Sequence, residues 1–194
     1  MSRIDELISE LCPDGVEFMP LGSILEMKAG KFISASDISA IQDDEFKFPC
    51  FGGNGIRGFV RNNNHQGKYV LIGRQGALCG NIKRVDGKFF ATEHAVVCNG
   101  AAAVDMDWAF HLLTAMNLNQ YATKSAQPGL SVGTIEQVRA PIPPLEVQRE
   151  IARVLDTFAK LETELEAELE ARRQQYRYYS DRLLRIPKRE SVAD

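Results

Sequence analysis

The segment from residue 145 to residue 186 constrains the fold more than any other part of the sequence, because it contains neither proline nor glycine. It follows the double proline Pro143-Pro144 and is ended by Pro187. Its apolar residues recur at steps of three and four, which predicts one continuous helix with a single apolar stripe. The stripe consists of Val147, Ile151, Val154, Leu155, Phe158, Leu161, Leu165, Leu169, Tyr176, Tyr179 and Leu183.

A helix over residues 145–185 would be about 60 Å long at a rise of about 1.5 Å per residue. The part of the chain that precedes it, roughly 145 residues, is too small a domain to cover a stripe of that length. We therefore expect the helix to form a coiled coil with a partner helix. The alternative is a terminal helix that folds back on its own domain.

The residues before the double proline are typical of a globular α+β domain. Apolar residues at helical spacing between Ile4 and Leu11 predict a short N-terminal helix, and a second helix is expected over residues 108–121. Short apolar segments separated by Gly, Asn and Asp predict a small curved sheet, mixed or antiparallel, with flanking helices; the segments are 48–51, 58–60, 69–72, 80–82 and 95–98. The expected organisation is a domain over 1–143, a long helix over 144–186 and a polar tail over 187–194.

The composition indicates a soluble protein without a membrane segment. The hydrophobic fraction is 44%, and no apolar run approaches the roughly 18 residues that span a bilayer. The N-terminus has no apolar core of a signal peptide, so we expect a cytoplasmic protein. The four cysteines, Cys12, Cys50, Cys79 and Cys98, are scattered without a C-x-x-C pair. We expect them to be reduced, and we expect no metal site.

The distribution of charge is more informative than the net charge of −3. Residues 28–88 contain ten Lys or Arg and five Asp or Glu, which leaves a local charge of +5 in an acidic protein. Positive charge concentrated in one region is expected of a protein that binds DNA. The alternative is a solvated surface on which basic residues cluster by chance.

Two glycine-rich stretches could bring the backbone close to a nucleic acid. Residues 51–59 contain four glycines within seven positions and precede the polar run 61–66. Residues 72–81 form a second glycine-rich turn after an expected strand, but they lack the features of a P-loop or of a dinucleotide fingerprint. Arg suits guanine, and Asn or Gln suits adenine, in the major groove. We expect DNA contacts from Lys31, Arg57, Arg61, Asn63, Arg74, Gln75, Lys83, Arg84, Lys124 and Gln127.

Catalytic alternatives are weak. Glu93-His94 lacks an evident nucleophile, so a hydrogen-bonded structural histidine is expected there. Asp14 with Glu45-x-Lys47 is only a loose imitation of a nuclease metal site, and Pro143-Pro144 lacks the residues that surround a methyltransferase active-site proline pair.

Taken together, these motifs resemble the specificity subunit of type I restriction–modification systems. The resemblance covers nearly the whole chain; it is carried by residues 2–8, 12–22, 48–55, 71–77, 125–131, 141–148, 151–156 and 173–179. Typical members have two recognition domains and two long helices, and this chain resembles a half-size form with one of each. Whether that form is natural or truncated stays open.

The resemblance implies a role without catalysis. Such a subunit reads one half of a bipartite DNA site and positions a methyltransferase subunit and, through it, a restriction subunit. S-adenosylmethionine, ATP and Mg²⁺ would be bound by those partners and not by this chain. Two alternatives remain: a structural adaptor that binds only protein, and the recognition subunit of a related restriction–methylation enzyme. The recognised bases and the spacer length do not follow from the sequence.

A single recognition domain would need a second copy, so we expect a homodimer with antiparallel long helices. Acidic residues 162–170 precede basic residues 172–177, and an antiparallel pair centred near residue 170 sets the two regions against each other. The expected contact residues are Ile151, Val154, Leu155, Phe158, Leu161, Leu165, Leu169 and Tyr176.

Overall fold

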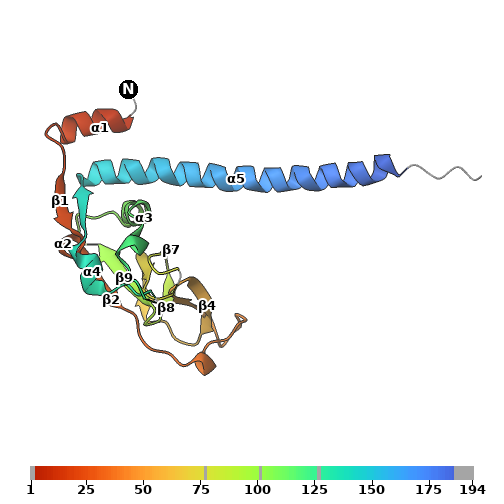
Figure 1. Cartoon of the computed structure of the whole chain (residues 1–194), viewed down its shortest axis with the longest axis horizontal. Helices are drawn as coiled ribbons and strands as arrows, with labels where there is room; N and C mark the ends of the chain where they lie inside the picture. The colour runs from red at the N-terminus through yellow and green to blue at the C-terminus, as the bar shows by residue number, and fades with distance from the viewer. Residues whose placement is uncertain (1–2, 77, 101, 126–127, 186–194) are drawn as a thin grey trace, which may run out of the picture. The chain divides into compact units, whose positions relative to one another are not determined.

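The computed structural model describes residues 3–76, 78–100, 102–125 and 128–185, and it confirms the α+β class with mostly antiparallel sheets and a long C-terminal helix (Figure 1). The chain divides into two compact units, Met1–Ala152 and Arg153–Asp194. The predicted tail, residues 187–194, lies outside the described residues.

The first unit is closed by a two-stranded ribbon that joins its two ends. Helix α1 (Arg3–Leu11) is present as expected, and none of its described residues is buried. Strand β1 (Glu17–Pro20) pairs antiparallel with β10 (Arg139–Ile142), and the short helix α2 (Leu21–Ile24) follows β1 directly. The ribbon thus brings the start of the domain beside the segment that leads into the long helix.

The first large sheet is antiparallel and has the order β2-β9-β6-β7. Its strands are β2 (Leu25–Ala29), β6 (Tyr69–Gly73), β7 (Ile82–Val85) and β9 (Ala95–Gly100). In β6, Val70 and Ile72 face the helices, whereas Leu71 faces the second sheet. Because both faces of the central strands are covered, these strands read as continuous apolar segments and not as alternating ones.

The second sheet has the order β4-β3-β8-β5. Its strands are β3 (Phe48–Gly52), β4 (Gly55–Val60), β5 (His65–Gln66) and β8 (Lys88–Ala91), and a short 3-10 helix, η1 (Ala35–Asp37), precedes them. The buried Phe89 ring lies at its centre, 5.8 Å from the ring of Phe51 and 5.3 Å from that of His65, centroid to centroid. One sheet was expected. The structure has three, the β1–β10 ribbon and two four-stranded sheets, because the apolar pattern of each strand does not reveal long-range pairings such as the parallel one of β3 with β8.

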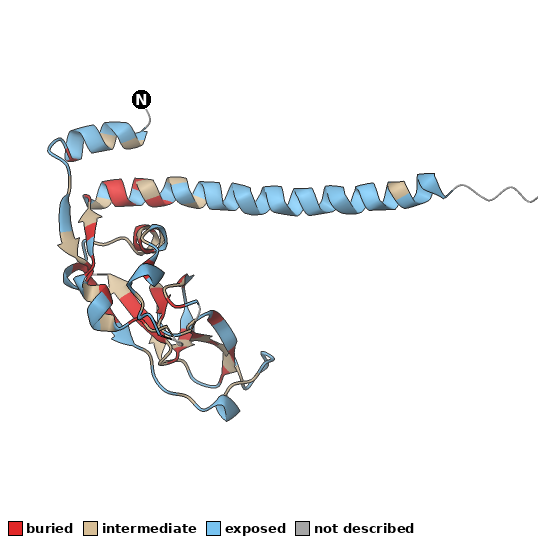
Figure 2. Cartoon of the chain, in the orientation of Figure 1, coloured by how far each residue is buried: buried red, intermediate tan, exposed pale blue. Residues whose placement is uncertain are grey.

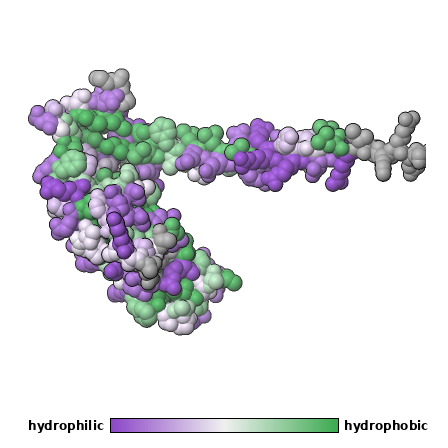
Figure 3. Space-filling view, viewed as in Figure 1, coloured by the Kyte–Doolittle hydropathy of each residue, from purple (hydrophilic) through white to green (hydrophobic). Residues whose placement is uncertain are grey.

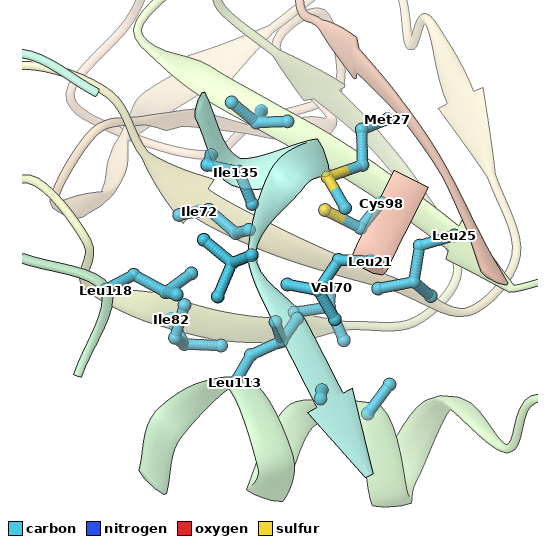
Figure 4. Packing of buried hydrophobic residues seen from close by; sticks show 14 of the residues in the cluster. Leu21, Leu25, Met27, Val70, Ile72, Ile82, Cys98, Leu113, Leu118 and Ile135 are labelled. Atoms are coloured by element: carbon cyan, nitrogen blue, oxygen red, sulfur yellow. The ribbon is translucent and has the colours of Figure 1, made fainter. Parts of the chain in front are cut away.

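Helices cover the outer face of the first sheet. Helix α3 (Met106–Ala115) begins at Asp105, whose carboxylate accepts hydrogen bonds from the amides of Asp107 and Trp108. The helix expected over 108–121 is divided, because Asn117 adopts a left-handed conformation (φ 47°) before the 3-10 turn η2 (Leu118–Tyr121). Helix α4 (Val132–Gln137) begins at Ser131. Figure 4 shows the resulting core, in which Leu113, Leu118 and Ile135 pack against strand residues.

The start of the long helix belongs to this core. Helix α5 (Leu145–Leu184) begins right after the double proline, and Val147 and Ala152 are buried in the first unit. The buried Gln148 side chain accepts from the Asp105 amide (2.8 Å) and donates to the carbonyls of Pro143 (2.8 Å) and Ala103 (3.1 Å). The division between the compact units therefore falls two turns after the helix begins.

The remaining turns of α5 form the second unit and are largely exposed (Figure 2). Of the predicted stripe, Ile151 and Val154 are partly buried. The other predicted contact residues, Leu155, Phe158, Leu161, Leu165, Leu169 and Tyr176, are exposed. An exposed apolar stripe of this length is typical of a surface that binds a partner.

Candidate nucleic-acid interface

The two glycine-rich stretches singled out in the sequence lie against each other in the structure. A Cβ atom at Gly73 would lie 2.0 Å from the carbonyl oxygen of Gly53, so this close backbone approach requires glycine. The Asn81 side chain donates to the Asn54 side-chain oxygen at 3.3 Å and links the same two turns. The β3–β4 turn and the loop after β6 therefore form one continuous surface.

Two further loops join these turns. The Arg74 amide donates to the His94 carbonyl at 2.9 Å, which attaches the 92–95 turn. The Gly76 amide donates to the Pro128 carbonyl at 3.0 Å, and the Leu130 amide donates to the Arg74 carbonyl at 2.8 Å. These two hydrogen bonds attach the polar loop 123–130. We call the described residues of 52–57, 73–83, 92–95 and 123–130 the four-loop surface.

The centre of the four-loop surface is polar and incompletely hydrogen-bonded. The His94 ring nitrogen Nδ1 lies 2.8 Å from Gln75 Oε1, and Arg74 Nη1 donates to the Glu93 carbonyl at 3.1 Å. Among the described residues, three buried side-chain atoms have no hydrogen-bond partner: Arg74 Nε, Thr92 Oγ1 and Glu93 Oε2. Buried polar atoms without partners are rare in proteins, and all three belong to residues of this surface.

Several predicted DNA-contact residues are brought together on this surface. The Arg57 side chain lies over Gly52: a Cβ atom added to this glycine would lie 2.6 Å from Arg57 Cδ. The Lys83 side chain extends to Gly55 in the β3–β4 turn. Arg57, Gln75, Lys83 and Lys124 are exposed, Arg74 is half-buried, and the backbone of the exposed Lys31 pairs with that of Thr92. Gln127 lies outside the described residues.

Three other predicted contact residues make contacts within the first unit: Arg61, Asn63 and Arg84. Arg61 bonds Glu45 (2.7 Å) and stacks over the Phe46 ring, and the Asn63 amide donates to the His65 carbonyl (3.0 Å). Arg84 projects from the opposite face of β7 to Lys83 and bonds Asp107 at 2.9 Å. Burial opposes ionisation of Asp107, but hydrogen bonds from Lys68 and Arg84 outweigh it and lower the pKa of this carboxyl. Their role in DNA contact stays a prediction.

The predicted DNA contacts did not include Asn54, Asn81 and Glu93, three polar residues of the four-loop surface. Both asparagines stand inside the glycine-rich stretches, and that position was the signal by which they could have been chosen. Two exposed apolar residues, Ile56 and Leu78, also lie on this surface. Apolar side chains of this kind contact the thymine methyl group in DNA complexes.

The four cysteines have the burial expected of unreactive structural cysteines, and two of them have raised thiol pKa values. All four are buried and free. Burial raises the pKa of the Cys98 thiol to about 12 and, against the opposing charge of Arg57, that of Cys50 to about 11. Within the described part of the chain, no cluster of His, Cys, Asp and Glu could hold a metal ion, and no helix is long and apolar enough to cross a membrane.

Comparison with known proteins gives one consistent result. Residues 13–171 match the type I restriction modification DNA specificity domain. The type I restriction enzyme EcoprrI specificity subunit of Escherichia coli is 55% identical over 141 residues, which are 73% of this chain and 35% of that protein. A putative type I restriction enzyme specificity subunit of Haemophilus influenzae is 33% identical over 157 residues, 75% of this chain and 41% of that protein. This chain thus spans well under half the length of either relative.

A solved structure shares the fold. The S subunit of a type I restriction-modification system from M. genitalium superposes with a TM-score of 0.65 at 18% identity. The match covers 87% of this chain and 46% of that one. At this level of identity, the likeness supports the arrangement of the elements and not the residues of the site.

Proposed function

The chain belongs to the family of type I restriction–modification DNA specificity proteins, and from this premise we propose that its first unit reads one half of a bipartite DNA site. Specificity subunits are non-catalytic. On this proposal the chain directs a methyltransferase subunit and a restriction subunit, which carry S-adenosylmethionine, ATP and Mg²⁺. The observation that carries the proposal is the four-loop surface, which presents the exposed Arg57, Gln75 and Lys83 and also contains the buried polar atoms of Arg74, Thr92 and Glu93 that lack partners within the described residues.

Two kinds of contact are expected from this surface. Exposed lysines such as Lys83 and Lys124 would bind phosphates and position the domain, because such contacts are independent of sequence. Arg57 and Gln75 would bond base edges, because Arg recognises guanine and Gln recognises adenine by paired hydrogen bonds. Asn54 and Asn81 extend the same set of donors and acceptors.

The long helix would pair two copies. A second copy with an antiparallel α5 would supply the second recognition domain, and two-fold symmetry would make the target an interrupted palindrome. Mapping of methylated sites in a host that carries the chain checks this symmetry. A target without palindromic character contradicts it.

DNA titrations of the assembled complex with its methyltransferase subunit test the recognition surface. Arg57→Ala should cost about 1–3 kcal/mol of binding free energy, concentrated at one base position. Lys83→Ala should weaken binding to all sequences and lower the slope of affinity against salt by about one. Lys160→Ala on α5 removes the same charge at a residue that is not part of the four-loop surface and should change neither.

Two outcomes would favour other functions. Unchanged affinity in a combined Arg57→Ala, Gln75→Ala and Lys83→Ala variant would remove the four-loop surface from DNA recognition. A complex that binds no DNA at low salt, and therefore shows no salt dependence, would instead indicate the structural adaptor.

A further inference from the structure

Ten residues of α5 form a regular seam along the helix. From Ile151 to Leu183 they follow alternating steps of four and three residues, which is the a/d pattern of a coiled coil. Eight of the ten positions are apolar, and the two others are Glu162 and Arg172. We call these ten residues the seam: Ile151, Leu155, Phe158, Glu162, Leu165, Leu169, Arg172, Tyr176, Tyr179 and Leu183. The apolar members from Leu155 onward are between 39% and 74% exposed.

The two charged positions lie symmetrically within the seam. Glu162 and Arg172 stand five residues before and five residues after residue 167. Figure 3 shows that hydrophilic residues interrupt the apolar ones along this helix. A charge placed in the seam must find an opposite charge in the partner helix, because an unpaired charge there would lose its hydration without compensation.

An antiparallel pair with its two-fold axis level with residue 167 satisfies every position. Leu165 then faces Leu169 of the second copy, and Phe158 faces Tyr176. Farther out, Leu155 faces Tyr179, and Ile151 faces Leu183. Glu162 faces Arg172 twice, once on each side of the axis. The guanidinium of Arg172 already lies 3.4 Å from Glu168 of its own helix, which holds it near the seam.

Other arrangements leave a seam charge opposed or unpaired. A parallel pair sets Glu162 against Glu162 and Arg172 against Arg172. An antiparallel register moved by one heptad sets Arg172 against Leu169 and Glu162 against Tyr179. The shifted register does bring Glu166 of one copy close to Arg173 of the other, which is favourable. The register centred on residue 167 instead brings Glu166 close to Glu166 of the second copy, and Glu168 close to Glu168, which is unfavourable. These flanking residues stay exposed, so solvent screens their charges. The charges within the seam therefore determine the register of the helix pair.

We propose that a second copy of the chain packs antiparallel along α5 with its two-fold axis level with residue 167, and that reciprocal Glu162–Arg172 pairs select this register and this partner. The inference rests on the proposed pairing of the long helices and adds its register and its selectivity. The axis lies about three residues from the position near 170 that the charge blocks alone indicated.

Disulfide cross-linking measures the register. A full-length Leu165→Cys chain is mixed and oxidised either with a Leu169→Cys chain or, in a second reaction, with a Tyr176→Cys chain; the two chains in each mixture carry different tags. The native cysteines are buried and do not compete. Cross-links between positions 165 and 169 should exceed those between positions 165 and 176 by about tenfold. The reverse ratio indicates the shifted register and overturns the inference while it leaves the antiparallel dimer intact.

Charge reversal measures the selectivity. E162R and R172E should each weaken self-association about tenfold or more, because like charges then meet at both pairs. The double variant E162R/R172E should recover the wild-type affinity, since it restores opposite charges in the same register. E164R makes the same change at an exposed position outside the seam and should leave self-association unchanged. A double variant as weak as the single ones overturns the role of the pair. A wild-type chain that stays monomeric in sedimentation overturns the helix pairing itself.

Discussion

Gln148 anchors the start of α5 through three hydrogen bonds to backbone groups of two other segments. Its side chain is almost completely buried, so removal of the amide would leave an N–H and two carbonyls without partners. Gln148→Leu should lower the free energy of unfolding by about 2–3 kcal/mol. Urea denaturation measures this loss. Gln174→Leu, at an exposed position of the same helix, should change stability by no more than about 0.5 kcal/mol. Equal stability of the two variants would contradict the anchoring role.

His65 makes the stability of the first unit depend on pH. Burial against Phe89, and secondarily the positive charge of Lys31, lower the pKa of His65 in the folded chain. The unfolded chain therefore takes up a proton at higher pH than the folded one, so stability falls as the pH drops through the ordinary histidine pKa of about 6.5. Urea midpoints measured between about pH 8 and about pH 5.5 should show this decline. His65→Phe keeps the ring stacking and should flatten the curve; an unchanged slope would assign the effect to other groups.

At the scale of elements, the contact between the two glycine turns decides the shape of the four-loop surface. Gly73→Ala would set a methyl group 2.0 Å from the Gly53 carbonyl oxygen and 3.2 Å from that of Leu78. Both obstacles are backbone atoms, so we expect a loss of about 3 kcal/mol in stability.

Gly133 supplies the matched control for this change. It lies in α4 with nothing within 4 Å of its Cβ position, and Gly133→Ala should stabilise the helix by about 0.5–1 kcal/mol. Thermal unfolding of both variants gives the comparison. A stable Gly73→Ala chain with normal DNA affinity would show that the close approach of the turns is not required.

At the scale of the whole molecule, the apolar stripe should make self-association dominate the solution behaviour. Burial contributes about 25 cal/mol for each Å² of apolar surface, so loss of two leucines from the stripe should be decisive. In sedimentation at micromolar concentration we expect a wild-type dimer and a monomeric Leu161→Glu, Leu165→Glu variant. Ala167→Glu with Ala171→Glu introduces the same charges outside the seam and should remain dimeric. The dimer would be refuted if the wild-type chain sediments as a monomer and if the complex with the methyltransferase subunit also contains only one copy of the chain.

The sequence by itself determined the elements whose signal is local. The helix over 145–184 followed from the spacing of its apolar residues and the absence of Gly and Pro. The strands around 48–51, 69–72 and 95–98 followed from short apolar segments between turn residues. The seam and its two charges are likewise visible in the sequence, because on one straight helix the position in the chain fixes the position in space.

Only the tertiary structure decided which of these elements meet. The parallel pairing of β3 with β8 joins segments about forty residues apart, and long-range pairings of this kind gave three sheets where one was expected. The same packing placed the Arg57 side chain over Gly52, Arg61 against Glu45 and Arg84 against Asp107. Arg and Asn serve recognition and folding equally well, so their type does not reveal their role. That role depends on which distant backbone lies within hydrogen-bonding distance, and burial of the shared core around Phe89 sets this arrangement.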